Sequence, residues 1–138
     1  MGVERLGQRP AELAGIEGAE YEWYYLSEQG RAYGVAALAL RGDSLELHLT
    51  LRRYGPRTRE ALGRDREWLL GRARELGARR IVGLRAAADG RPDPRLTRFA
   101  ALFGFSRQYL IQAVVLELEG ALQPDPAVLD GPDAKEGP

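Results

Sequence analysis

The chain of 138 residues contains no cysteine, and His48 is its only histidine. Without cysteine, disulfides, thiolate nucleophiles and cysteine-ligated metal sites are excluded. A single histidine also excludes His-rich metal sites and paired-histidine chemistry. We therefore expect no bound metal.

Long apolar runs are absent as well. No stretch approaches the ~18 apolar residues that a membrane span requires, and the first residues lack the apolar run of a signal peptide. We expect a soluble, cytoplasmic protein with no membrane partner. A chain of this length usually forms one domain, which buries roughly 70% of the surface that the unfolded chain exposes.

Negative charge is scarce in the middle of the chain, although the net charge of the whole chain is zero. Residues 52–98 contain fourteen arginines against six acidic residues, a local excess of eight positive charges. Such an excess favours a phosphate-bearing partner. Lys135 is the only lysine, so a general preference for arginine on solvated helix faces explains the same count, and both interpretations stay open.

Three strands are predicted after a weakly patterned start. Residues 1–19 hold at most one short helix, whereas residues 20–27 and 31–41 are strand-like and separated by a turn. Residues 44–51 alternate strictly, with leucines on one face and Glu46, His48 and Thr50 on the other, because strand side chains change face at every residue. Short turns between the three predict an antiparallel meander.

The apolar period then changes to that of a helix. It predicts a helix over 58–76 with Gly77 as its C-cap, a strand over 81–86, and a helix from the cap Asp93 to about Phe103. A last strand is expected over 106–118, and the Pro- and Gly-rich residues 119–138 are expected to be disordered. This order predicts an α/β (α+β) domain whose mixed, mostly antiparallel central sheet carries helices on both faces.

Two segments resemble the GCN5-related N-acetyltransferases, the GNAT superfamily. EWLLGRARELGARRIVGL (67–84) is similar to the family's third helix and fifth strand, and RFAALFGF (98–105) to its Gly-Phe motif after the fourth helix. The resemblance covers 20–118 and divides the chain into a short N-terminal segment (1–19), an acetyltransferase-like domain (20–118) and a tail (119–138). It implies an acyl-CoA N-acyltransferase fold that transfers an acetyl group from acetyl-CoA to an amine.

The resemblance also implies where acetyl-CoA binds. In the family the fourth strand separates from the fifth, and the pantetheine arm lies against the open strand backbone. The pyrophosphate then sits at the N-terminus of the following helix, where free amides and the helix dipole favour an anion. Here that strand is 44–51 and the loop is RRYGPRTR (52–59). The implied cofactor-binding residues are Leu49, Leu51, Arg52, Arg53, Tyr54, Gly55, Arg57 and Thr58.

Catalytic residues are also suggested by position. Members of the family often carry a carboxylate on the fourth strand as general base, which points to Glu46. His48 is the other candidate, because an unperturbed imidazole can exchange a proton near neutral pH. The family's tyrosine acid, four residues before the glycine of Gly-Phe, corresponds to Ala100, so Tyr109 and Tyr54 are the remaining hydroxyls. For all four candidates, a packed or solvated structural role is the competing interpretation.

Other readings remain. The aromatic run Tyr21, Trp23, Tyr24 and Tyr25 could line an acceptor pocket or a partner surface, or it could simply occupy the two faces of an ordinary strand. The chain also resembles acetyltransferase-like proteins of bacteriophages, which fits a catalytically inactive GNAT-fold protein with an interaction or structural role and a protein partner. A third alternative is nucleic-acid binding through the arginine-rich segment, with affinity that falls steeply with salt.

Overall fold

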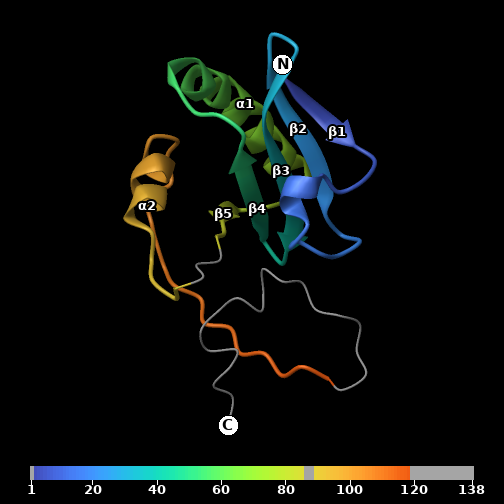
Figure 1. Cartoon of the computed structure of the whole chain (residues 1–138), viewed down its shortest axis with the longest axis vertical. Helices are drawn as coiled ribbons and strands as arrows, with labels where there is room; N and C mark the ends of the chain where they lie inside the picture. The colour runs from blue at the N-terminus through green and yellow to red at the C-terminus, as the bar shows by residue number, and fades with distance from the viewer. Residues whose placement is uncertain (1, 86–88, 119–138) are drawn as a thin grey trace. The chain divides into compact units, whose positions relative to one another are not determined.

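The computed structural model describes residues 2–85 and 89–118 (Figure 1). Its internal contacts divide the chain into two units, Met1–Arg85 and Ala86–Pro138. The first unit contains a five-stranded sheet, one long α-helix and a 3-10 helix. The second contains α2 (Pro94–Ala101). Within the described residues, no helix is both long and apolar enough to cross a membrane.

The strands of the first unit lie in the order in which they occur in the chain, β1-β2-β3-β4-β5. The predicted meander is present as β2 (Glu22–Glu28), β3 (Arg31–Arg41) and β4 (Ser44–Leu51), which pair antiparallel. After α1 (Pro56–Glu75), β5 (Arg80–Gly83) returns parallel to β4. The sheet is therefore mixed and mostly antiparallel, as the sequence predicted.

Local backbone chemistry explains where these elements begin and end. The β2–β3 turn places Gln29 and Gly30 at φ values of 51° and 78°, and turns with two such residues match the twist of a hairpin. Pro56 begins α1, where its missing N–H costs no helical hydrogen bond. Gly77, at φ 79°, follows the helix as the expected left-handed cap.

Each face of the sheet has its own core. On the first face, Tyr24, Leu38 and Leu45 pack with α1, and the Tyr24 and Trp68 ring centroids lie 4.6 Å apart. On the second face, a 3-10 helix (Ala11–Leu13) covers part of the sheet. There Leu13, Val35 and Ala37 are buried, with Ile16, Tyr21, Trp23 and Tyr25 packed around them. Helices thus cover both faces, and the aromatic run divides between them as strand alternation requires.

A β-bulge adapts the sheet to α1. The β2–β3 register shifts between Leu26 and Ser27, so Tyr33 has no directly opposite residue. Tyr33 is fully buried and donates a hydrogen bond to Asp65 of α1. Burial and this carboxylate raise the pKa of Tyr33. The bulge therefore provides a polar contact inside an otherwise apolar layer.

Two expectations are corrected. The first residues contain a strand, β1 (Val3–Leu6), which pairs antiparallel with β2; four residues are too few for alternation to be visible in the sequence. Conversely, residues 106–118 form no strand. Their apolar composition satisfies the strand pattern, but a strand also needs a partner, which a pattern does not specify. The expected disorder of 119–138 lies outside the described residues.

Most other boundaries agree within a few residues. Helix α1 begins two residues before the predicted Thr58, and β5 ends three residues before the predicted Ala86. Asp93 caps α2 as predicted, because its side chain accepts a hydrogen bond of 2.9 Å from the backbone N–H of Arg95. This helix ends at Ala101, two residues before the predicted Phe103.

Candidate active site

The first feature of the site is the point where β4 and β5 separate. Their register ends at Leu47 and Gly83, and the last contact is a hydrogen bond of 3.0 Å from the Leu84 N–H to the Leu47 carbonyl. Because peptide groups alternate along a strand, Leu49 and Leu51 direct theirs to the same side as Leu47. Beyond the last pair, the described residues supply no strand partner on that side. This stretch of β4 is an open edge.

The open edge leads directly into the N-terminus of α1. Gly55 is the N-cap, and no side chain caps the helix. The first helical backbone bond is from Arg59 N–H to Gly55 carbonyl, 3.0 Å long, which leaves the amides of Arg57 and Thr58 without a helical acceptor. Pro56 contributes none. A helix of 20 residues directs its positive dipole end here.

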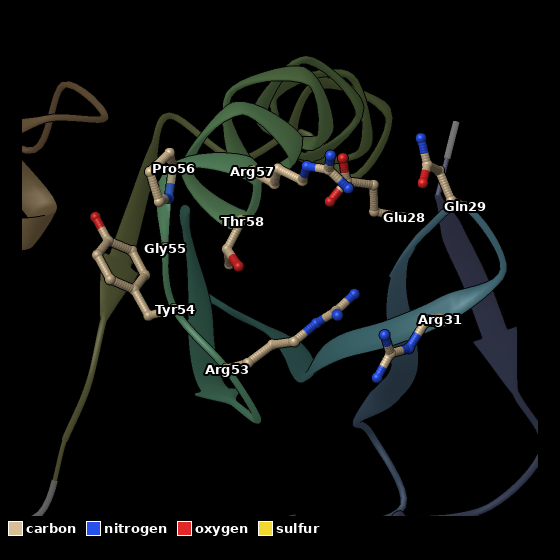
Figure 2. Close-up of a pocket in the computed structure, with 9 residues that line it drawn as sticks. All are labelled: Glu28, Gln29, Arg31, Arg53, Tyr54, Gly55, Pro56, Arg57 and Thr58. Carbon is tan, nitrogen blue, oxygen red and sulfur yellow. The ribbon is translucent and has the colours of Figure 1, made fainter.

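A hollow of about 500 Å³ lies beside this helix end. In Figure 2, Arg53 and Arg57 extend from one side toward Glu28 and Gln29 of the β2–β3 hairpin on the other. No described residue forms an ion pair with Arg53, Arg57 or Arg31. The hollow is lined by Glu28, Gln29, Arg31, Arg53, Tyr54, Gly55, Pro56, Arg57 and Thr58.

The predicted cofactor residues are therefore largely brought together. Leu49 and Leu51 lie on the open edge, and five residues of the loop line the hollow. Arg52 does not line it: its Nε donates to Glu12, and its guanidinium lies 5.2 Å from the Tyr25 ring centroid. The hydrogen bond to Glu12 raises the pKa of Arg52. The five lining residues are Arg53, Tyr54, Gly55, Arg57 and Thr58.

The hairpin residues of the hollow were not anticipated from the sequence. Arg31 follows the Gln29-Gly30 turn and lines the hollow only because the fold brings that turn close to the start of α1. The clustering of arginine in residues 52–59 was the visible signal, but Arg31 lies more than twenty residues earlier. Only the meander's closure against α1 brings them to one hollow.

The second feature of the site is a cluster of polar side chains on the face of β4 that points away from α1. Glu46 and His48 are two residues apart, so both project from that face, and Glu46 Oε2 lies 2.8 Å from His48 Nε2. Tyr21 donates its hydroxyl hydrogen to the same Oε2. The side chains of Glu46 and His48 are only 16% and 17% exposed. His48 immediately follows Leu47, the last residue of β4 that pairs with β5.

Arg41 and Glu20 complete this cluster. Arg41 Nη2 donates to the Tyr21 hydroxyl over 3.2 Å, Arg41 Nη1 lies 2.8 Å from Glu20 Oε1, and Arg41 Nε lies 3.6 Å from Glu46 Oε1. The sequence places Arg41 at the end of the predicted strand 31–41 but assigns it no role in a site. Its position at the end of β3, on the face of Glu46, was the available signal.

The surroundings of Glu46 favour its charged form. Partial burial raises the pKa of its carboxyl, but the hydrogen bonds from Tyr21 and His48 and the charge of Arg41 outweigh burial. The pKa of Glu46 therefore lies below its ordinary value. An ionised Glu46 requires that His48 Nε2 carry a proton in their hydrogen bond, which leaves Nδ1 as an acceptor when the ring is neutral.

The remaining predicted residue is in the other unit. Tyr109 is 55% exposed and lies beyond α2. Ala100, the position of the family's tyrosine acid, lies within α2 and has no hydroxyl. Tyr54 is also exposed and lies at the hollow.

Comparison with known proteins identifies the fold. Neither a scan against protein-family models nor a search of curated proteins gives a match. Among solved structures, an aminoglycoside N-acetyltransferase in complex with CoA is similar with a TM-score of 0.50 and 12% identity, over 73% of this chain and 79% of that one.

Two further structures are similar with lower scores. An aminoglycoside acetyltransferase from an uncultured soil metagenomic sample has a TM-score of 0.44 and 20% identity, over 80% of this chain and 78% of that one. A glucosamine-6-phosphate N-acetyltransferase from Arabidopsis thaliana has a TM-score of 0.44 and 12% identity, over 72% and 69%. With the mixed sheet and open strand edge described above, the comparison with the CoA complex gives this chain an acyl-CoA N-acyltransferase-like fold.

Proposed function

We propose that this protein is an N-acetyltransferase that moves an acetyl group from acetyl-CoA to an amine. The observation that carries the proposal is that the open edge of β4 leads into the uncapped N-terminus of α1, beside which the arginine-lined hollow lies. The peptide groups of Leu49 and Leu51 fit the amides of a pantetheine arm. The free amides of α1, with Arg53 and Arg57, fit a pyrophosphate.

The residues present therefore suit the cofactor chemically. When bound, acetyl-CoA supplies an acetyl thioester that an amine attacks. The backbone of β4 beyond its pairing with β5 would hold the cofactor, and His48 is the first residue of that part of the strand. Fixing both reactants in this way removes much of the entropic part of the barrier.

We assign the proton transfer to His48. An attacking amine must lose a proton, and His48 Nδ1 is the acceptor when Glu46 accepts from Nε2. Glu46 is a poor base because its pKa is lowered, so its role is to orient the ring and stabilise its protonated form. Tyr21 and Arg41 hold Glu46 in place.

The cofactor proposal is tested by comparing coenzyme A with pantetheine, which lacks the phosphates. Coenzyme A at a hundred times its Kd should stabilise the protein by roughly 2.7 kcal/mol. Substituting both Arg53 and Arg57 by Gln should weaken coenzyme A binding and leave pantetheine binding unchanged. Absence of any thermal shift with millimolar acetyl-CoA would contradict the proposal.

A catalytically inactive protein of the same fold is the alternative, and Ala100 favours it. Residue 100 carries no acid that could protonate the leaving thiolate. Tyr109 and Tyr54 are exposed and stand at other positions, so neither replaces that acid by position. This alternative includes an interaction or structural role of the bacteriophage kind. It predicts that coenzyme A binding, if present, occurs without acetylation of any amine in a panel of small amines, aminoglycosides and peptide N-termini.

Nucleic-acid binding through the arginine-rich segment has less support. Several of its arginines are held by acids: Arg72 contacts Glu22 and Glu75, and Arg80 contacts Asp43 over 2.6 Å. Paired arginines release fewer counterions on binding phosphate. Mobility of a labelled oligonucleotide at low salt should therefore be unchanged by the protein.

A further inference from the structure

The hollow beside the start of α1 has room for more than a pyrophosphate. Its volume of about 500 Å³ lies within the range, roughly 300–1,000 Å³, of pockets that enclose a whole small-molecule ligand. The proposed function uses only one wall, formed by residues 53–58. The opposite wall is the β2–β3 hairpin, from which Glu28, Gln29 and Arg31 line the hollow (Figure 2). The hairpin wall is therefore placed to bind a second group of the same ligand.

Thr58 shows that the wall at α1 is built to receive an anion. The residue is only 5% exposed, and Figure 2 shows its hydroxyl pointing from the helix start into the hollow. Among the described residues, none forms a hydrogen bond with this hydroxyl. In the same part of the chain, no fully enclosed side-chain oxygen or nitrogen lacks a partner, so the Thr58 oxygen keeps contact with the hollow. There its hydroxyl can donate to an anion beside the free amides of the helix.

Arg31 supplies the positive charge of the hairpin wall. Gln29 and Gly30 form the tight turn that precedes it. The hairpin register then places Arg31 directly opposite Glu28. In spite of this pairing, Arg31 forms no ion pair with Glu28 or with any other described residue. Because a guanidinium is always charged and presents several N–H donors, Arg31 is available to an anion held in the hollow.

The charges of the hollow suit a ligand with more than one phosphate group. Three arginines line it against a single acid, Glu28, which leaves an excess of two positive charges. Like charges that face one hollow raise its potential, and an anion with several charges relieves that potential best. Coenzyme A carries, besides its pyrophosphate, a third phosphate on the 3′-oxygen of its ribose. A ligand that extends from α1 to the hairpin would present this group to Arg31.

We propose that Arg31 makes the cofactor site specific for coenzyme A by binding its adenosine 3′-phosphate from the hairpin, while Arg53, Arg57 and the start of α1 hold the pyrophosphate. The inference rests on the proposed function and adds one residue and one ligand group to it. A guanidinium can donate two N–H bonds to a terminal phosphate. Because Arg31 is exposed, solvent screens the contact, and we expect it to change the Kd about tenfold.

Coenzyme A and dephospho-coenzyme A test the assignment, because they differ only in the 3′-phosphate. Isothermal titration calorimetry of the unchanged protein should give a Kd for coenzyme A about tenfold below that for dephospho-coenzyme A. Arg31→Gln should raise the first Kd about tenfold and leave the second as it is, so that the preference disappears. A preference that persists in Arg31→Gln would overturn the proposal.

Two control variants separate the contact from general charge. Arg79→Gln removes another exposed arginine, which lies outside the hollow, and should leave both Kd values unchanged. A preference lost equally in this variant would contradict the role of Arg31. Substituting both Arg53 and Arg57 by Gln should weaken the two ligands by the same factor, since both carry the pyrophosphate. Circular dichroism serves as the folding control for every variant.

The same titrations distinguish a failure of this inference from a failure of the proposed function. If neither ligand binds at millimolar concentration, the cofactor assignment fails and this inference fails with it. If both bind the unchanged protein with equal Kd values, the cofactor assignment stands and only the role of Arg31 is lost. As a second readout, adenosine 3′,5′-bisphosphate should displace coenzyme A more strongly than adenosine 5′-monophosphate does from the unchanged protein. Equal displacement by the two nucleotides would also contradict the role of Arg31.

Discussion

Two clusters of glutamate, tyrosine and arginine lie on opposite faces of the same sheet, and their geometry differs. On the face of α1, Arg72 of the helix contacts both carboxylate oxygens of Glu22, over 3.0 Å from Nε and 2.5 Å from Nη2. Tyr24 donates to Glu22 over 2.6 Å. This cluster joins β2 to α1 through a bidentate pair, which is the strong arrangement of an arginine and a carboxylate.

On the other face, Glu46 is held by residues of the sheet and of the segment before β2. Its Oε2 accepts from Tyr21 and lies beside His48, while the nearest guanidinium atom is 3.6 Å from Oε1. No α-helix takes part in these contacts. In the first cluster, the bidentate arginine joins β2 to α1. In the second, histidine is the nearer partner of the glutamate, and the same residue types hold a glutamate–histidine pair in place on the sheet.

The largest expected effect separates the clusters by activity. His48→Gln should lower kcat/KM for acetyl transfer at least about a hundredfold, because it removes the proposed proton acceptor. Tyr24→Phe, on the other face, should leave kcat/KM unchanged. Steady-state kinetics with acetyl-CoA and an accepted amine measure both. Equal losses in the two variants would remove the distinction between the faces.

The second effect separates them by stability. Arg72→Met leaves the Glu22 carboxylate, only 15% exposed, without its bidentate partner, and should lower the free energy of unfolding by about 2 kcal/mol. Arg41→Met is the matched change on the other face. Since the Arg41 side chain is 47% exposed, its loss should cost less than about 1 kcal/mol. Urea unfolding of both variants gives the difference.

The third effect appears in acid. Hydrogen bonds from Arg72, opposed by burial, lower the pKa of Glu22 below its ordinary 4.5. The unfolded chain then binds this proton before the folded one does, so the contribution is complete above the ordinary pKa and is lost as pH falls through the folded pKa. Glu22→Gln should therefore flatten the decline of unfolding free energy below pH 4.5. Glu60→Gln, an exposed change on α1, should leave that decline as it is.

The smallest effect appears in alkali. Burial, with the hydrogen bond to Glu22, raises the pKa of Tyr24 from 10.0 to about 12. The folded chain keeps this proton longer, so the associated stability is complete below pH 10 and is lost as pH rises through 12. Absorbance of ionised tyrosine should show a late-titrating group in the native protein that Tyr24→Phe removes. A titration unchanged by that substitution would assign the late group elsewhere.

The sequence predicts the meander, α1 and β5 because their signals are local. Strict alternation in β4, the helical period after Thr58 and the glycine at position 77 each act through neighbouring residues. The strand β1 and the fate of 106–118 were missed because pairing depends on a distant partner. A four-residue strand such as β1 is defined by β2, some twenty residues away.

The candidate site divides in the same way. Glu46 and His48 share a face by alternation alone, and the approach of Arg53 and Arg57 to the start of α1 follows from their adjacency in the chain. The addition of Arg31, and the diversion of Arg52 to Glu12, depend on how the hairpin and the first segment fold back. No local pattern contains that information.

The part of β4 that pairs with β3 but not with β5 has a consequence for hydrogen exchange. The amides of His48 and Thr50 point toward β3 and should exchange slowly, whereas those of Leu49 and Leu51 face the open side and should exchange quickly. One continuous strand would thus alternate between slow and fast amides over its last four residues. A ligand that lies along this edge should erase the alternation at Leu49 and Leu51 and leave the neighbouring amides as they were.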